Sequence, residues 1–184
     1  MAALVESMFS VREVPWHGLG TIVREAPSSE EAIRLAGLDW DVYPEEVYTK
    51  SGNKIPGAYA NVRSNDGSAL GIVGERYQIV QNSEAFNFTD ELLGEGVKYE
   101  TAGSLKDGKV IWLLAQLPEA YKILGDEVTP WVCFTNSFDG SGAIKVAMVS
   151  TRVVCNNTLN VALKNAKRTW IFRITMLSEQ SRLQ

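Results

Sequence analysis

The sequence predicts an α+β domain, with antiparallel meander sheets and about three helices packed on one face. Short runs alternate apolar and polar residues, as strands with one buried side do. Three connections between such runs carry hairpin signals, at residues 65–67, 106–108 and 138–142. Hairpins imply antiparallel pairing, because parallel strands need long crossovers. The length of 184 residues suits one domain, which we expect to cover residues 1–184.

The expected elements begin with a glycine-rich turn at residues 15–20, where Gly18 or Gly20 should adopt a positive φ. A helix follows, with Ser28 and Glu31 as its capping box and Gly37 at its end. Strands are then expected over residues 40–47, 58–63 and 70–80, the last with a bend at Gly74.

A second helix should begin with Ser83 as its cap and extend to residue 93. Its expected core residues are Phe86, Leu92 and Leu93. The strand pattern then returns over residues 97–104, 109–117, 129–136 and 143–151. A third helix follows, capped by Asn156 or Asn157, with Leu159, Leu163 and Ala166 on its apolar face. A short strand over residues 170–174 completes the pattern.

Charge is distributed unevenly along the chain. Of 18 Lys+Arg and 22 Asp+Glu in all, residues 140–184 hold seven basic residues and a single acidic one, Glu179, which leaves residues 1–139 acidic. A basic segment in an acidic chain is typical of a surface that binds a polyanion. The two parts can equally pair with each other across the fold. Both interpretations stay open at this point.

Several classes of protein are disfavoured by composition. The N-terminus lacks the features of a signal peptide, and no apolar run approaches the ~18 residues of a membrane span. Cys133 and Cys155 do not suggest a disulfide framework. We therefore expect a cytoplasmic protein that makes no membrane contact.

Conventional catalytic and cofactor motifs are also missing from the sequence. One histidine and two cysteines lack the ligand spacing of a zinc site, and residues 71–76 match neither a phosphate-binding loop nor a dinucleotide motif. We expect no metal and no cofactor. A cysteine-dependent enzyme would need His17 beside Cys155, and a turn residue and a buried thiol are the simpler interpretation.

The most distinctive segment is residues 152–159, at the junction of a strand and the third helix. A helix N-terminus offers free N–H donors to phosphate, and Arg152 just before it could add a bidentate phosphate contact. Basic residues then continue along the helix, with Trp170 and Phe172 nearby, as in proteins that hold single strands by charge and base stacking. The candidate nucleic-acid-binding residues are Arg152, Asn156, Asn157, Lys164, Lys167, Arg168 and Arg173. A solvated basic helix beside two core aromatics is the alternative.

Several stretches together carry a family resemblance. They are residues 16–20, 36–40, 71–74, 76–82, 99–105, 136–141 and 152–159. The chain resembles the "phage/plasmid-like protein" family, a domain-of-unknown-function family of phages and mobile elements. Members usually run longer, so the resemblance implies that this chain is the N-terminal part of a longer architecture. At the level of the fold, the layout is similar to phage single-strand annealing proteins, which form rings and bind single-stranded DNA.

These expectations lead to one principal hypothesis and two alternatives. The first is a non-catalytic protein of phages or plasmids that binds single-stranded DNA in recombination or annealing, as a homo-oligomer in the bacterial cytoplasm. The second is a protein-interaction module, such as an inhibitor of a host defence enzyme, whose acidic residues 1–139 form the working face. The third is the cysteine-dependent enzyme.

Overall fold

The computed structural model describes residues 4–94, 97–117, 121–123, 126–128 and 130–172. Seven strands form the main sheet: β1 (Val5–Val11), β2 (Thr21–Val23), β6 (Lys98–Leu105), β7 (Val110–Gln116), β10 (Trp131–Ser137), β11 (Ile144–Val149) and β12 (Arg168–Phe172). A second sheet contains β3 (Val42–Tyr48), β4 (Lys54–Arg63) and β5 (Ala69–Gly74). A third contains β8 (Tyr121–Ile123) and β9 (Asp126–Val128). The helices are α1 (Ser29–Leu35), α2 (Asn82–Leu93) and α3 (Asn156–Lys164).

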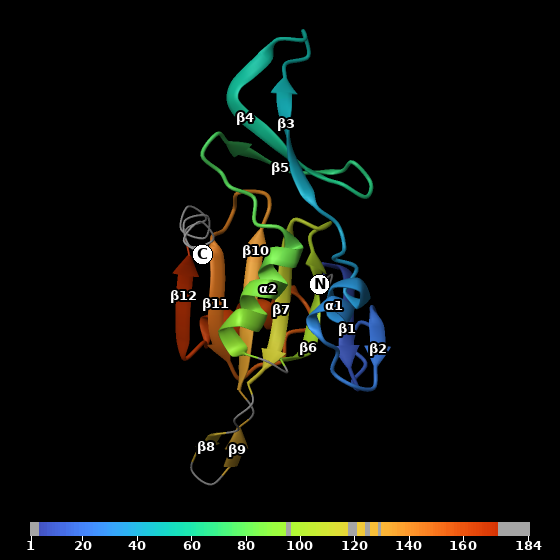
Figure 1. Ribbon diagram of the computed structural model, residues 1–184, viewed down its shortest axis with the longest axis vertical. Helices are drawn as coiled ribbons and strands as arrows, with labels where there is room; N and C mark the ends of the chain where they lie inside the picture. Colours follow the sequence, from blue (N-terminus) through green and yellow to red (C-terminus); the bar gives the residue numbers. More distant parts are fainter. Residues whose placement is uncertain (1–3, 95–96, 118–120, 124–125, 129, 173–184) are drawn as a thin grey trace.

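The main sheet has the order β12-β11-β10-β7-β6-β1-β2. Every neighbouring pair in it is antiparallel except β1 and β2, which run parallel. The three-stranded sheet projects beyond one end of the main sheet, and the β8–β9 hairpin projects beyond the other (Figure 1). The three expected hairpins join β4 to β5, β6 to β7 and β10 to β11. The α+β class is therefore confirmed.

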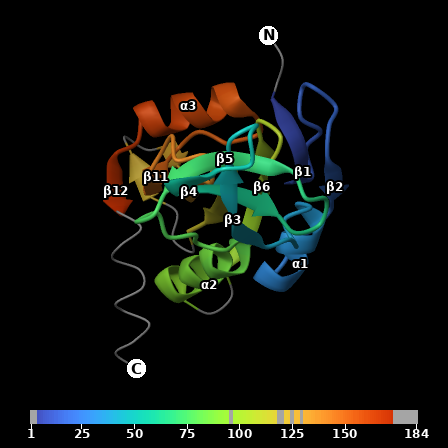
Figure 2. The same cartoon turned by 90° about the horizontal axis from the view of Figure 1, so that it is seen from above.

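The helices cover both faces of the main sheet, and the prediction of a single covered face is wrong. Residues of α1 and α2 share one core cluster with Leu113 of β7, whereas α3 packs on the opposite face, over Trp112 and Leu114. Figure 2 shows α3 on one side of the sheet and α1 and α2 on the other. The reason lies in residues 111–115, which are all fully buried. An uninterrupted apolar run needs cover on both sides of its strand.

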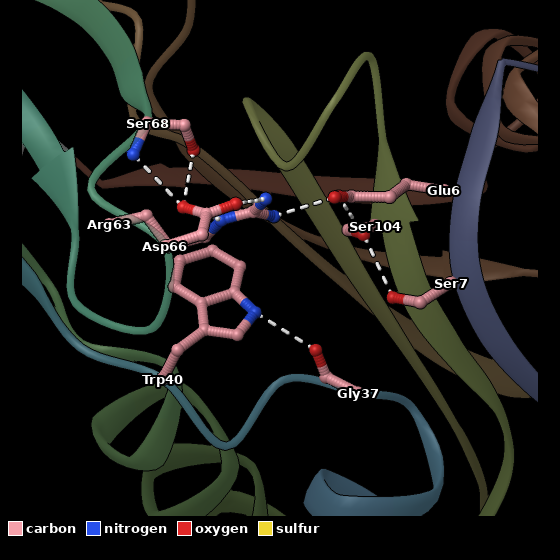
Figure 3. Close-up of polar contacts among 8 residues, drawn as sticks. All are labelled: Glu6, Ser7, Gly37, Trp40, Arg63, Asp66, Ser68 and Ser104. Carbon is pink, nitrogen blue, oxygen red and sulfur yellow. Dashed lines mark hydrogen bonds and ion pairs between the residues drawn. The ribbon is translucent and has the colours of Figure 1, made fainter.

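A cluster of polar residues fixes the three-stranded sheet to the main sheet (Figure 3). Arg63, at the end of β4, donates to the carboxylates of Asp66 and of Glu6, the latter from β1 at 2.7 Å. Its guanidinium lies over the ring of Trp40, 5.4 Å from the centroid. Ser104 of β6 donates to the other oxygen of Glu6 at 2.9 Å. Hydrogen bonds to the Asp66 carboxylate, with that from Arg63 first, hold its pKa below the ordinary value.

Several local predictions fail at the helix starts. Ser28 is the N-cap residue of α1, but its side chain makes no capping hydrogen bond. The α2 helix is capped by Gln81 and Glu84 instead of Ser83, with the Gln81 N–H donating to Glu84 at 2.7 Å.

One predicted core residue of α2 is also wrong. Leu92 is exposed and does not join the core. An exposed leucine at the border of the apolar stripe is not distinguishable from a core residue by spacing alone.

The expected strand over residues 70–80 ends early, at Gly74. The chain turns there, with the Tyr77 N–H donating to the Gly74 carbonyl at 2.9 Å, and crosses to the main sheet. Its polar groups then bond to β10 and not to a neighbouring strand of its own sheet. The Tyr77 hydroxyl donates to the Ser137 carbonyl at 2.6 Å, and the Asn136 amide donates to the Val80 carbonyl at 3.2 Å. Alternating apolar residues here therefore mark a connection between sheets.

Candidate nucleic-acid interface

The segment from residue 140 to residue 172 carries basic residues and no acidic one. It forms β11 and β12, which lie at one edge of the main sheet (Figure 1), and α3, which lies across one face of that sheet (Figure 2). Its basic residues are Lys145, Arg152, Lys164, Lys167 and Arg168. No carboxylate occurs within the segment, so an acidic partner of any of these five residues must come from another element. Among the described residues, Arg152 has such partners and the other four form no ion pair.

Arg152 is fully engaged inside the protein. Its guanidinium donates to Glu100 of β6 at 2.8 Å and to Glu13 at 2.9 Å. It also donates to the Ser10 hydroxyl at 3.1 Å and to the Val11 carbonyl at 2.6 Å. The side chain is 17% exposed. These bonds tie the segment before α3 to β1 and β6, so Arg152 could contact a phosphate only by giving up one of its carboxylates.

The start of α3 differs from the predicted asparagine cap. Cys155 is the N-cap residue, and the Thr158 hydroxyl accepts from its backbone N–H at 3.0 Å. Asn156 and Asn157 are the first two helical residues. Asn157 is exposed and Asn156 is half-buried. Neither amide side chain is used as the helix cap, and the N–H groups of Asn157 and Thr158 donate to the Cys155 sulfur, so these two donors are not free for an anion.

The Cys155 thiol is surrounded by hydrogen-bond donors. Burial on its own raises the pKa of this thiol. Hydrogen bonds from the backbone and hydroxyl of Thr158, from the Trp16 side chain and from the Asn157 N–H outweigh that effect, so the pKa lies below the ordinary value. The residue is only 1% exposed. These donors favour the thiolate form relative to the thiol, but a sulfur this deeply buried is not accessible to a substrate.

His17 binds the residue that precedes this cysteine, yet it is not arranged as a catalytic base. Its Nε2 faces the Val154 carbonyl at 2.8 Å, and its Nδ1 accepts from the Leu19 N–H at 3.1 Å. A carbonyl only accepts and an amide N–H only donates, so Nε2 carries the proton. Both nitrogens are then occupied, which favours a structural role in the turn. Gly18 and Gly20 in that turn have φ values of 70° and 96°, as the sequence predicts.

Lys164, Lys167 and Arg168 do not share one helix, contrary to the sequence-based interpretation. Lys164 is the last residue of α3, and Arg168 is the first residue of β12. Lys167 lies in the connection, where its N–H donates to the Met148 carbonyl at 3.2 Å. Asn165 ends the helix with a φ of −97° and a ψ of 8°. The turn brings the chain back beside β11 before a further helical turn can form.

The strand register places the basic residues on both sides of the sheet edge. Arg168 pairs with Met148, and Trp170 pairs with Val146, which belongs to the core cluster of α1 and α2. Arg168 and Trp170 therefore face the α2 side, because directly paired residues share a face. Lys145 pairs with Ile171 and faces the α3 side, as Lys164 does by its position on that helix. The three residues Lys164, Lys167 and Arg168 are all exposed.

We call Lys145, Lys164, Lys167 and Arg168 the basic edge. Within the described residues, none of the four forms an ion pair, whereas Arg63 and Arg152 each bind two carboxylates. The Trp170 side chain is 43% exposed beside Arg168. Arg173 lies outside the described residues, as does the end of the strand predicted over 170–174. The role of each of these residues in binding nucleic acid stays a prediction.

In the described part of the chain, two features bear on metal binding and on membrane insertion: the grouping of metal-ligating side chains, and the length and polarity of the helices. No group of three or more His, Cys, Asp or Glu side chains converges there in a way that could hold a metal ion. None of the helices described is long and apolar enough to span a bilayer.

Comparison with known proteins identifies one family. The model of a domain of unknown function, DUF932, matches residues 69–175, which is more than half of the chain. The matched region begins at β5 and includes α2, α3 and the whole basic edge. No curated protein and no solved structure matches the chain.

Proposed function

The chain belongs to the DUF932 family, and because the name of that family assigns no activity, we propose a function from the surface of the protein. We propose that it binds single-stranded nucleic acid along the basic edge, without catalysis. The cellular setting of this proposal is DNA recombination or annealing in phages or plasmids, in the cytoplasm of a bacterial host.

The absence of any acidic residue from 140 to 172 carries the proposal. On α1, by contrast, acidic and basic residues are interspersed, with Glu30 and Glu31 one turn before Arg34. The basic edge has no such neighbours on its own elements. Uncompensated positive charge raises the local concentration of a polyanion and releases its counterions on binding.

Single strands suit this edge better than a duplex. The strand β12 presents Arg168 and Trp170 two residues apart on one side. A guanidinium can bind a phosphate while the neighbouring indole stacks on an unpaired base, and stacking contributes about 1–3 kcal/mol per base in single-strand-binding proteins. Bases within a duplex are already stacked on each other. Trp170 therefore supports a preference for single strands.

The test is a titration of labelled single- and double-stranded oligonucleotides of equal length, followed by fluorescence anisotropy. The variant Lys164→Ala/Lys167→Ala/Arg168→Ala should weaken single-strand binding. The slope of log K against log salt should fall by roughly 0.7 for each phosphate that the variant no longer neutralises. The matched control is Lys50→Ala/Arg76→Ala/Lys98→Ala, which removes the same charge from exposed residues outside the basic edge. It should bind like the wild type.

Two outcomes would end this proposal. One is a wild-type protein that binds no oligonucleotide at low salt. The other is an equal reduction of binding in both triple variants, because that would make the effect one of net charge and not of the basic edge. Folding should be nearly unchanged in both variants, since exposed charges contribute only about 0–1 kcal/mol.

A protein-interaction module, such as an inhibitor of a host defence enzyme, remains the second candidate, and the three-stranded sheet favours it. Tyr43, Tyr48 and Ile72 are large apolar side chains that stay exposed on this projecting sheet. Exposed apolar groups on a projection are typical of protein contacts. If the anisotropy titration shows no binding, substitution of these three residues should abolish inhibition of the host defence enzyme in cells. The variant Lys164→Ala/Lys167→Ala/Arg168→Ala should still inhibit that enzyme.

A further inference from the structure

The main sheet ends in two strands that have no outer neighbour among the described residues, β12 and β2. Proteins usually block exposed edges with proline, charge or a bulge. The edge strand β3 of the smaller sheet follows this rule, with Pro44 and a register shift near Tyr48. In β12, residues 169–172 read Thr-Trp-Ile-Phe, with neither charge nor proline. β12 begins with the charged Arg168, but among the described residues nothing pairs with its outer edge, so a strand of another molecule can pair with residues 169–172.

Each open edge carries an exposed isoleucine on the same face of the sheet. Ile171 of β12 is 64% exposed and Ile22 of β2 is 40% exposed. Ile171 pairs with Lys145, which faces the α3 side. Ile22 pairs with Ser10, whose neighbours Phe9 and Val11 belong to the core cluster on the α1–α2 side. Since neighbours along a strand point to opposite faces, Ile22 also faces the α3 side.

The strand directions allow the two edges to meet. With β1 and β2 parallel and every other neighbouring pair antiparallel, β2 and β12 run in opposite directions. A second copy shifted along the sheet, without being turned over, therefore brings its β12 antiparallel to β2 of the first copy. The α3 faces of the two copies then coincide, so that Ile22 and Ile171 lie on the same side of the joint.

The charges at the two edges are opposite. Residues 21–41, which contain β2 and α1, carry five acidic residues and two basic ones. Figure 1 shows α1 beside β2, at the edge opposite to β12. Arg168 faces the α1–α2 side at the other edge. In a shifted copy, it would therefore lie on the face where α1 presents Glu30 and Glu31.

We propose that copies of this chain associate head to tail, with the β2–α1 edge of one copy docking on the β12 edge of the next. Backbone pairing of β2 with β12 makes the sheets continuous. The isoleucines pack on the α3 side, and the ion pairs form on the other. Lys145 is the cross-strand neighbour of Ile171 and lies beside the joint, whereas Lys164 is on α3 and not on an edge strand. Arg168 belongs to both the basic edge and the joint. The inference needs no bound nucleic acid and does not depend on the proposed function.

Sedimentation of the full chain without nucleic acid tests this arrangement. The wild type should form larger oligomers as the protein concentration rises and smaller ones as salt is added. Ile22→Lys blocks one edge and Ile171→Lys blocks the other, and each should weaken self-association about tenfold or more, because an unpaired charge would be buried at the joint. Leu92→Lys is the matched control, since Leu92 is 52% exposed and lies on α2, outside both edge strands. It should associate like the wild type.

Mixing the two blocked variants gives the decisive measurement. The Ile22→Lys chain retains its β12 edge, and the Ile171→Lys chain retains its β2 edge, so an equimolar mixture should form heterodimers and nothing larger. A mixture that stays monomeric overturns the proposal, as does a wild type that is monomeric at every concentration. If Ile22→Lys still dimerises while Ile171→Lys does not, β12 pairs with itself and the head-to-tail arrangement is wrong.

Discussion

Replacement of Arg152 by methionine separates a structural role of this residue from a role in binding phosphate. The guanidinium donates at 2.8 Å to Glu100, whose side chain is 10% exposed, and at 2.9 Å to Glu13, whose side chain is 75% exposed. Removal of one partner of a buried pair costs about 3–5 kcal/mol, whereas an exposed pair contributes about 0–1 kcal/mol. Arg12 remains at 4.0 Å from Glu100 and offsets part of this cost.

We therefore expect Arg152→Met to lower the free energy of unfolding by about 3 kcal/mol. Urea denaturation measures this value, and the double variant Arg152→Met/Glu100→Gln provides the control. It should recover part of the stability, because the uncompensated carboxylate is gone. At a temperature where Arg152→Met is folded, its affinity for single strands should match that of the wild type. A variant with wild-type stability that no longer binds single strands would refute this reasoning and make Arg152 a phosphate ligand.

Two further predictions concern a turn and a buried thiol. Gly20→Ala should destabilise the protein by about 2–4 kcal/mol in thermal melts and Gly18→Ala by only about 1 kcal/mol. Both residues have a positive φ, but an added Cβ at Gly20 would lie 2.5 Å from Met8 Cγ, and the space at Gly18 is open. Equal destabilisation by the two variants would contradict this. For Cys133, burial raises the pKa from 9.0 to about 12. The unfolded chain loses this proton first, so stability should fall by up to about 1.4 kcal/mol per pH unit above pH 9. Cys133→Ala should flatten that fall in urea titrations between pH 9 and 10; an unchanged slope would refute the assignment.

Local signals in the sequence predict most of the elements, because hairpins depend on a few adjacent residues. Asn65-Asp66-Gly67 is an example. Gly67 adopts a φ of 71°, and the Arg63 N–H donates to the Ser68 carbonyl across the turn at 3.0 Å. The short connection after α3 could not be predicted from the sequence, because it depends on a contact with a distant segment and not on adjacent residues. Lys164, Lys167 and Arg168 have helical spacing, and only pairing with β11 ends the helix.

The grouping of strands into separate sheets is beyond the reach of the sequence. Residues 77–80 have the alternation of a strand, but their partners are backbone carbonyls and side chains of β10, some 60 residues away in the chain. Similarly, the cap of α3 comes from Cys155 and Thr158, although the preferred capping residues Asn156 and Asn157 lie beside them. Cys155 is buried and its sulfur accepts a hydrogen bond from the Trp16 side chain, a contact that no local propensity reports.

The uneven charge of the chain has two explanations, and the structure divides the basic residues between them. Arg152 pairs with Glu13 and Glu100, both from the acidic part of the chain, so this charge is balanced across the fold. The basic edge has no such partners among the described residues. An arginine that binds two carboxylates in fixed positions holds elements together, whereas Arg168 on the edge strand and Lys164 at the end of α3 are exposed and form no ion pair among the described residues. Among the described basic residues from 140 to 172, those without an ion pair are the residues of the basic edge, and we expect substitutions at Arg152 to report on stability and not on binding.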